Sequence, residues 1–155
     1  MAKPAGKGLT VKVRRLGNGR DIPLPAYETE GSSGMDIRAA VEETLVLRPG
    51  EIGFIPTGLA LSVPPGYEAQ IRPRSGLALR NGIGMVNAPG TIDSDYRGEL
   101  GLVMINWGRE PFAIRRGDRI AQMVFARTFR ASIEEVEDLD STDRGMGGFG
   151  HSGVE

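Results

Sequence analysis

Hydrophobic and polar positions alternate over short stretches of this chain, and a period of two residues is typical of β-strands. The clearest alternation covers residues 9–16. Short apolar or alternating runs continue at 44–47, 52–56, 59–63, 67–72, 83–86, 100–107, 112–114 and 120–125. Turn residues separate several of these runs, at 49–50, 57–58 and 64–66. Many short strands at this spacing predict an all-β sandwich or barrel.

Residues 73–82 interrupt the alternation and predict one short helix. Ser75 is a good N-cap residue, because its hydroxyl can accept a hydrogen bond from a free backbone N–H of the first helical turn. The apolar residues 77–79 favour a helix, and Asn81 followed by Gly82 would end it. The 23 glycines and 10 prolines of the chain disfavour longer helices elsewhere.

The composition excludes several classes of function. A chain of 155 residues is one domain of ordinary size, and its net charge of −1 argues against bulk binding of nucleic acid. With no cysteine and one histidine, the chain has no thiol nucleophile, disulfide, thiolate metal site or histidine cluster. No apolar run has the length of a signal peptide or a membrane span, so we expect a cytoplasmic protein with no membrane partner.

Candidate chemistry is concentrated in residues 90–100, where glycines flank two carboxylates, an aromatic ring and an arginine. Asp93 and Asp95 are two residues apart, so in an extended segment they would share one face while Tyr96 takes the other. Considered alone, the stretch is explained by a polar hairpin loop, a tight turn between the apolar runs 83–86 and 100–105. Asn87 lies six residues before Asp93, and a hairpin can bring its amide beside the turn to read a pyrimidine edge or to stabilise the turn.

Other loops carry polar groups that suit an anionic ligand. Asp36 follows a glycine-rich stretch and either caps a turn or pairs with a nearby arginine. Arg74 and Ser75 stand at the start of the predicted helix, where free backbone N–H groups favour an anion. Gln122 interrupts an apolar strand, and a buried amide needs partners, in a subunit contact or at a site arginine.

The C-terminal residues 143–153 are rich in glycine and cannot hold a conformation unaided, because ordering glycine costs the most backbone entropy. A disordered tail is one interpretation. The other is a loop that wraps phosphate with its N–H groups, Arg144 and Ser152, and stacks Phe149 on a base. We therefore divide the chain into a β domain, residues 1–140, and a flexible arm, residues 141–155.

Five of these segments, in order and spacing, resemble the five motifs of the homotrimeric dUTPase (deoxyuridine 5′-triphosphate nucleotidohydrolase) family. They are residues 34–37, 73–78, 87–98, 116–122 and 144–153. The resemblance implies a distorted jelly-roll-like β-barrel, hydrolysis of dUTP to dUMP and pyrophosphate, and a homotrimer whose active sites are shared between subunits. It leaves two alternatives open, a nucleotide enzyme of the same fold similar to dCTP deaminase and a non-catalytic nucleotide-binding trimer.

The resemblance also implies a role for each matched residue. Asp93 would activate the water that attacks the α-phosphorus, and a carboxylate ionised at neutral pH can accept that proton. Mg²⁺ would be held mainly by the substrate phosphates, with Asp36 contributing through water. The residues expected to bind the substrate are Arg74, Ser75, Gly76, Asn87, Thr91, Ile92, Tyr96, Met104, Gln122, Arg144, Phe149, Gly150, His151 and Ser152.

Overall fold

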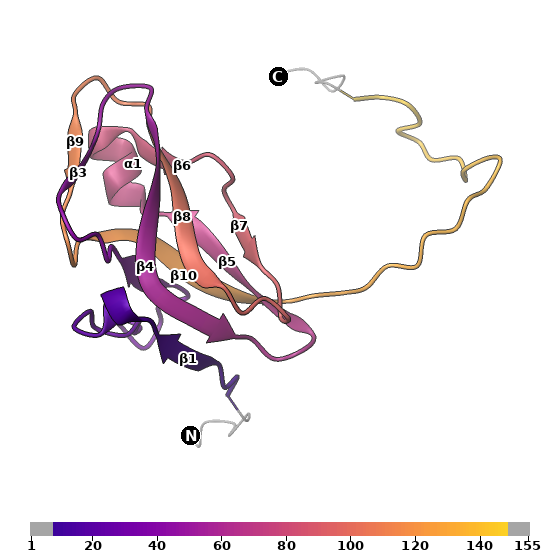
Figure 1. Cartoon of the computed structure of the whole chain (residues 1–155). Helices are drawn as coiled ribbons and strands as arrows, with labels where there is room; N and C mark the ends of the chain where they lie inside the picture. The colour runs from indigo at the N-terminus through magenta and orange to yellow at the C-terminus, as the bar shows by residue number, and fades with distance from the viewer. Residues whose placement is uncertain (1–7, 149–155) are drawn as a thin grey trace.

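The computed structural model describes residues 8–148, and strands dominate this part of the chain (Figure 1). The strands are β1 (Lys12–Arg15), β2 (Met35–Arg38), β3 (Leu45–Leu47), β4 (Ile52–Ser62), β5 (Tyr67–Pro73), β6 (Ile83–Met85), β7 (Gly90–Ile92), β8 (Glu99–Asn106), β9 (Phe112–Ile114) and β10 (Arg119–Arg127). A 3₁₀ turn, η1 (Gly17–Gly19), and one α-helix, α1 (Ser75–Asn81), complete the elements of the described residues.

Two four-stranded antiparallel sheets enclose one hydrophobic core. Their strand orders are β1-β4-β8-β6 and β2-β10-β5-β7, and β3 pairs with β9 in a separate two-stranded sheet. The predicted all-β class is therefore confirmed. In residues 8–148 the sheets stay open and do not close into a barrel, so the architecture is closer to a sandwich.

Strand β8 shows how the alternating sequence pattern produces the core. Leu100, Leu102 and Met104 point inward and are at most 1% exposed, while the residues between them face outward and are half-buried. Successive side chains of a strand lie on opposite faces, so one strand can supply core and surface together. Met104 pairs across the sheet with Met85 of β6, which is also buried.

The turn predicted at residues 57–58 is wrong, because β4 continues through it as one strand. The pairing of β4 with β8 shifts register between Pro56 and Ala60, so the strand absorbs extra residues as a bulge. The buried Thr57 hydroxyl donates a hydrogen bond to the Leu100 carbonyl at 2.5 Å, and Gly58 has a positive φ of 67°. An irregularity of this kind looks like a turn in the sequence, because both can use a glycine with a positive φ.

Helix α1 lies where the sequence predicts it, but its first turn differs from the prediction. Arg74, rather than Ser75, occupies the N-cap position, and no side chain caps the helix. The predicted end is confirmed, since Gly82 adopts the left-handed conformation that closes helices. The helix joins β5 to β6 at one end of the sheets (Figure 1).

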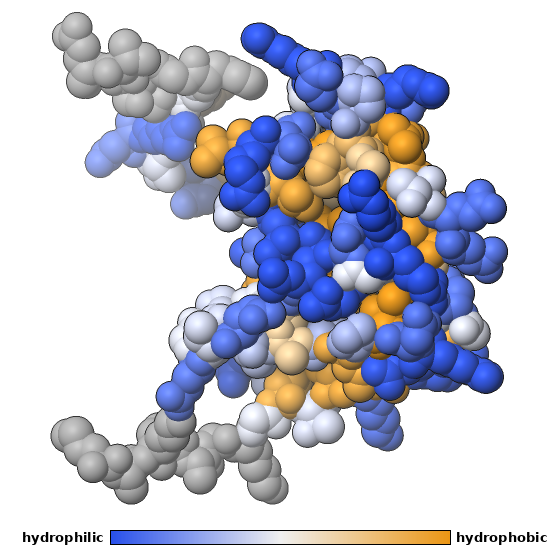
Figure 2. Space-filling model, turned by 90° about the vertical axis from the view of Figure 1, so that its left-hand side faces the viewer, coloured by the Kyte–Doolittle hydropathy of each residue, from blue (hydrophilic) through white to orange (hydrophobic). Residues whose placement is uncertain are grey.

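After β10 the chain leaves the body of the molecule. Residues 128–148 form no strand or helix and are largely exposed, and they extend away from the sheets (Figure 1). Figure 2 views the molecule from the left-hand side of Figure 1 and shows hydrophobic surface exposed between bands of hydrophilic side chains. In the part of the chain that the structure describes, no helix has the length and apolar character needed to cross a membrane.

Candidate active site

Three of the segments singled out in the sequence meet at one pocket of about 280 Å³. Strand β10 lies between β2 and β5, and its register places Gln122 opposite Asp36 on one side and Arg72 on the other. The pocket is lined by residues of β2, β10, the start of α1 with its N-cap residue, and the loop before β2: Glu28, Ser32, Gly34, Asp36, Arg74, Ser75, Gly76, Arg119 and Gln122. The structure thus brings together residues up to 94 positions apart in the sequence, from Glu28 to Gln122.

Asp36 is the centre of a charged network in this pocket. One carboxylate oxygen, Oδ1, lies 3.0 Å from Arg74 Nε, and the other, Oδ2, accepts a hydrogen bond from Arg119 Nη1 at 3.1 Å. Arg74 Nη1 also donates to the Arg119 carbonyl at 3.0 Å, which fixes the two arginines relative to each other. Of the two interpretations of Asp36, pairing with a nearby arginine is therefore correct in this conformation. The same contacts hold two guanidinium groups ready for an anion.

The neighbouring residues of the pocket are held by close backbone approaches. Gln122 Nε2 donates to the Pro73 carbonyl at 3.0 Å. A Cβ at Gly34 would lie only 2.5 Å from Gln122 Oε1, which is too close for a side chain at that position. Glycine at position 34 therefore leaves the space that the amide occupies. A Cβ at Gly76 would likewise lie 2.9 Å from Nη2 of Arg80, so that guanidinium rests on the backbone beside the pocket.

Asp93 lies in a different place, in a β-turn between the two sheets. Residues 93–96 form the turn, in which the Tyr96 N–H donates to the Asp93 carbonyl at 3.2 Å. Asp93 and Asp95 therefore lie in a tight turn, as the flanking glycines indicate, and not in an extended segment. The antiparallel pairing expected between the two flanking apolar runs is confirmed, since β6 pairs with β8. The segment between them is longer than a simple turn, because it contains β7, which pairs with β5 in the other sheet. Among residues 8–148 the exposed Asp93 carboxylate has no hydrogen-bond or ion-pair partner.

Tyr96 folds back over this turn. Its hydroxyl donates to the Glu99 carbonyl at 2.9 Å, and its ring lies directly against Gly98, where a Cβ would overlap the ring. Tyr96 is 45% exposed, so part of the residue remains accessible to a ligand. Thr91 is exposed and Ile92 half-buried on β7, and Asn87 lies beside Gly90 with its Nδ2 3.4 Å from the position of a Cβ there.

The Asp93 turn borders its own pocket of about 490 Å³ at the far end of β5. Ile92 pairs with Ala69, so Asp93 lies near the level of Glu68, whereas Asp36 lies at the level of Arg72. Four residues along a strand correspond to ~13 Å, and the three strand spacings between β2 and β7 to ~14 Å. The separation between Asp93 and the Asp36 pocket within one chain is thus roughly 19 Å.

The remaining predicted residues fall into two groups. The side chain of Met104 is wholly buried in the core, so in this conformation a contact with a ligand would have to come from its backbone. Arg144 lies in the segment beyond β10, where its Nε donates to the Gly147 carbonyl at 2.7 Å. The other arm residues, Phe149, Gly150, His151 and Ser152, lie outside the described residues.

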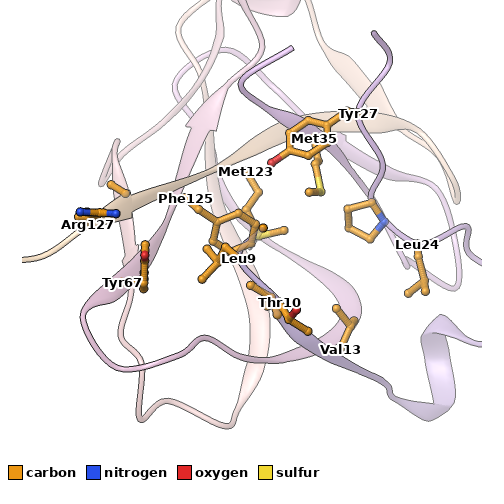
Figure 3. A pocket seen from close by; sticks show the side chains of 14 residues that line it. Leu9, Thr10, Val13, Leu24, Tyr27, Met35, Tyr67, Met123, Phe125 and Arg127 are labelled. Atoms are coloured by element: carbon orange, nitrogen blue, oxygen red, sulfur yellow. The ribbon is translucent and has the colours of Figure 1, made fainter. Parts of the chain in front are cut away.

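Another cavity, of about 750 Å³, holds none of the predicted site residues (Figure 3). Apolar and aromatic side chains point into it, among them Leu9, Tyr27, Met35, Met123 and Phe125 (Figure 3). Such a lining suits an apolar chain segment and gives a phosphate few donors. We therefore place the chemistry in the two polar pockets, although this apolar cavity is larger.

Sequence reasoning assigned no role to Arg119 or Glu28, which also line the Asp36 pocket. Arg119 Nη1 donates to Glu28 Oε1 at 3.1 Å as well as to Asp36. The pairing of β2 with β10 brings Arg119 to Asp36, and a single sequence does not reveal which strands pair. The only indication in the sequence was the position of Arg119 directly before the apolar run of β10.

A metal ion held by the protein alone does not fit this site. Residues 8–148 contain no group of three or more His, Cys, Asp or Glu side chains that could hold one. Asp36 uses one lone-pair direction of each oxygen for an arginine and retains others for water. The residues fit Mg²⁺ held mainly by a phosphate chain, since this ion keeps several of its waters.

An open all-β fold with paired arginines at one pocket and a free carboxylate at another defines a protein suited to a phosphorylated ligand. Comparison with known proteins identifies the group more closely. The model of the dUTPase family matches residues 20–153. Deoxyuridine 5′-triphosphate nucleotidohydrolases from Anaeromyxobacter sp. (strain Fw109-5) and Caldanaerobacter subterraneus subsp. tengcongensis are 60% and 53% identical to this chain over 146 residues. These matches cover 94% of this chain and 98% and 99% of the relatives.

Solved structures show the same relationship. The dUTPase of Staphylococcus bacteriophage 80alpha, with dUpNHpp, superposes with a TM-score of 0.83 at 29% identity, covering 94% of this chain and 99% of the phage protein. A mutant dUTPase from phage phi11 of S. aureus, described with a structural Mg(II) ion, gives 0.74 at 27% identity, covering 83% and 97%. The chain therefore belongs to the dUTPase family.

Proposed function

We propose that this protein hydrolyses dUTP to dUMP and pyrophosphate. The observation that carries the proposal is the family match over residues 20–153, together with relatives named for this activity at up to 60% identity across nearly the whole chain. The pocket around Asp36, Arg74 and Arg119 supports it, because paired guanidinium groups bind phosphate oxygens through charge-assisted hydrogen bonds. We take the protein to act in the cytoplasm, where the reaction would lower the concentration of dUTP and supply dUMP for dTMP synthesis.

In the proposed mechanism, Asp93 acts as the general base. Its carboxylate takes a proton from a water molecule while the water oxygen forms a bond to the α-phosphorus. The bond from the α-phosphorus to the oxygen bridging to the β-phosphorus breaks, and pyrophosphate leaves with the electron pair. The exposed, unpartnered state of Asp93 in the described structure leaves both of its oxygens free for this role.

Arg74, Ser75, Gly76 and Gln122 would bind the phosphate chain, and Mg²⁺ would neutralise part of its charge, with Asp36 in contact through water. Tyr96 would lie on the deoxyribose and leave no room for a 2′-hydroxyl. Asn87, Thr91 and Ile92 would contact the nucleoside beside it. The arm, with Arg144, Phe149, Gly150, His151 and Ser152, would close over the bound nucleotide.

We further propose that the active site forms between copies of the chain, in a homotrimer. The roughly 19 Å between Asp93 and the Asp36 pocket exceeds the length of a triphosphate chain, so one chain cannot apply both to the same nucleotide. In a cyclic assembly the Asp93 turn of one copy can face the phosphate pocket of the next.

The proposed activity is tested by incubating the protein with dUTP, dCTP or UTP and Mg²⁺ and separating the products. We expect dUMP and pyrophosphate from dUTP, with little turnover of the other two. Release of ammonia from dCTP would favour the deaminase alternative instead. Nucleotide binding without turnover of any of the three would favour a non-catalytic role.

A further inference from the structure

Glu28 places a second carboxylate at the phosphate pocket. It belongs to the loop before β2, where Thr29 and Ser32 stabilise a turn: Ser32 N–H donates to the Thr29 carbonyl at 3.1 Å, and the Thr29 N–H donates to Ser32 Oγ at 3.1 Å. This turn directly follows Glu28 and holds the loop at the rim of the pocket, which Glu28 and Ser32 both line. Glu28 and Asp36 share the same nitrogen, Nη1 of Arg119.

The two carboxylates differ in how firmly they are held. An Nη nitrogen of arginine carries two N–H groups, so Glu28 and Asp36 together use both. The Asp36 side chain is 17% exposed and is bound by two arginines, whereas that of Glu28 is 64% exposed and has one. An exposed ion pair contributes little net stability, so a phosphate oxygen approaching Nη1 would displace Glu28 and leave Asp36 in place.

The charges of the pocket lining balance in the described part of the chain. Arg74 and Arg119 contribute two positive charges, and Asp36 and Glu28 two negative ones. The guanidinium of Arg80 lies against Gly76 beside the pocket and adds a further positive charge there. Replacing Glu28 by a neutral side chain would therefore raise the local charge by one unit and free an N–H of Arg119.

We propose that Glu28 is a specificity-determining residue of the phosphate pocket. It competes with a bare phosphate chain for Arg119 and so favours a chain that arrives with a divalent cation, and it promotes release of pyrophosphate. This inference rests on the proposed function, because it assumes that the pocket takes the phosphates of the substrate. A phosphate chain that carries Mg²⁺ has less negative charge and is repelled less by the extra carboxylate.

The test compares the wild-type protein with Glu28→Gln, which keeps the size of the side chain and removes its charge. Isothermal calorimetry with inorganic pyrophosphate, with and without Mg²⁺, measures the pocket independently of turnover. We expect Glu28→Gln to bind metal-free pyrophosphate about 5-fold more tightly at low ionic strength, as one unit charge at a few ångströms in a solvated site allows. With Mg²⁺ the gain falls to about 2-fold, and at ~0.5 M salt both gains shrink because salt screens exposed charges.

Glu43→Gln is the matched control, because this substitution removes the same charge from an exposed residue that lies outside the pocket. It leaves pyrophosphate affinity unchanged if the effect is local. In turnover, Glu28→Gln should lower KM for dUTP and increase inhibition by pyrophosphate.

Weaker or unchanged pyrophosphate binding in Glu28→Gln overturns the inference, because Glu28 would then merely hold Arg119 in position. Absence of binding to both proteins overturns it as well. Failure of the proposed function gives a different result, since the wild-type protein would then bind pyrophosphate as described and fail to convert dUTP.

Discussion

The distance between Asp93 and the Asp36 pocket leads to a prediction about mixtures of two inactive variants. Asp93→Asn removes the proposed base and leaves the phosphate pocket intact. Arg74→Ala removes a guanidinium of that pocket and leaves Asp93 intact. If each active site takes Asp93 from one copy and Arg74 from the next, an assembly that contains both variants can rebuild intact sites.

The magnitude follows from random assembly. At equal amounts, a given site receives its Asp93 from an Arg74→Ala chain with a chance of about one half, and its Arg74 from an Asp93→Asn chain with the same chance. About a quarter of all sites therefore carry both intact groups, whatever the number of copies in the ring. If one chain supplied both groups, no site would be intact in any mixture.

The assay is dUTP turnover after the two variants are unfolded together in urea and refolded together. We expect about a quarter of wild-type activity per site, against a loss on the order of 10²-fold or more for each variant alone. Wild-type protein taken through the same refolding step gives the reference. Activity of the mixture equal to the mean of the two parents would refute the shared site, and a measured mass other than three chains would refute the trimer.

Further substitutions test individual residues. Asp93→Asn should lower kcat by 10²- to 10⁴-fold in steady-state assays and keep nucleotide affinity in calorimetry, because the amide retains size but cannot take a proton; unchanged turnover would exclude Asp93 as the base. Tyr96→Ala should raise UTP hydrolysis relative to dUTP, and Gly98→Ala should act in the same direction because its Cβ would displace the Tyr96 ring. An unchanged ratio of kcat/KM values in both would place sugar selection elsewhere. Deleting residues 141–155 should leave assembly and thermal stability intact and greatly reduce turnover, and full activity of the shortened chain would show that the arm is idle.

The sequence predicts the fold where local patterns decide the structure. The alternation of apolar residues in β8 and the left-handed glycine that ends α1 are both local features, and both predictions agree with the structure. The predicted turn within β4 is wrong because a bulge and a turn use the same residues, and only the partner strand β8 distinguishes them. Similarly, the serine that was expected to cap α1 lies one position inside it, and Arg74, whose side chain contacts Asp36 and the Arg119 carbonyl, takes the N-cap position.

The site is less accessible to sequence reasoning, because long-range strand pairing creates it. Asp36 and Arg119 are 83 residues apart and meet only because β2 pairs with β10. Met104 was expected at the ligand, yet the alternation of β8 points its side chain into the core. Asp93 and Arg74 lie near opposite ends of β5, and this separation is likewise a consequence of strand register. The order of the motifs in the sequence does not reveal the register.

In the proposed mechanism water attacks the α-phosphorus of dUTP, and hydrolysis in ¹⁸O-labelled water shows which phosphorus atom is attacked. The products are separated after a single turnover, and their masses are measured by mass spectrometry. We expect one ¹⁸O atom in dUMP and none in pyrophosphate, because the oxygen of the attacking water becomes bonded to the α-phosphorus. Label in pyrophosphate, or no conversion of dUTP at all, would contradict this mechanism.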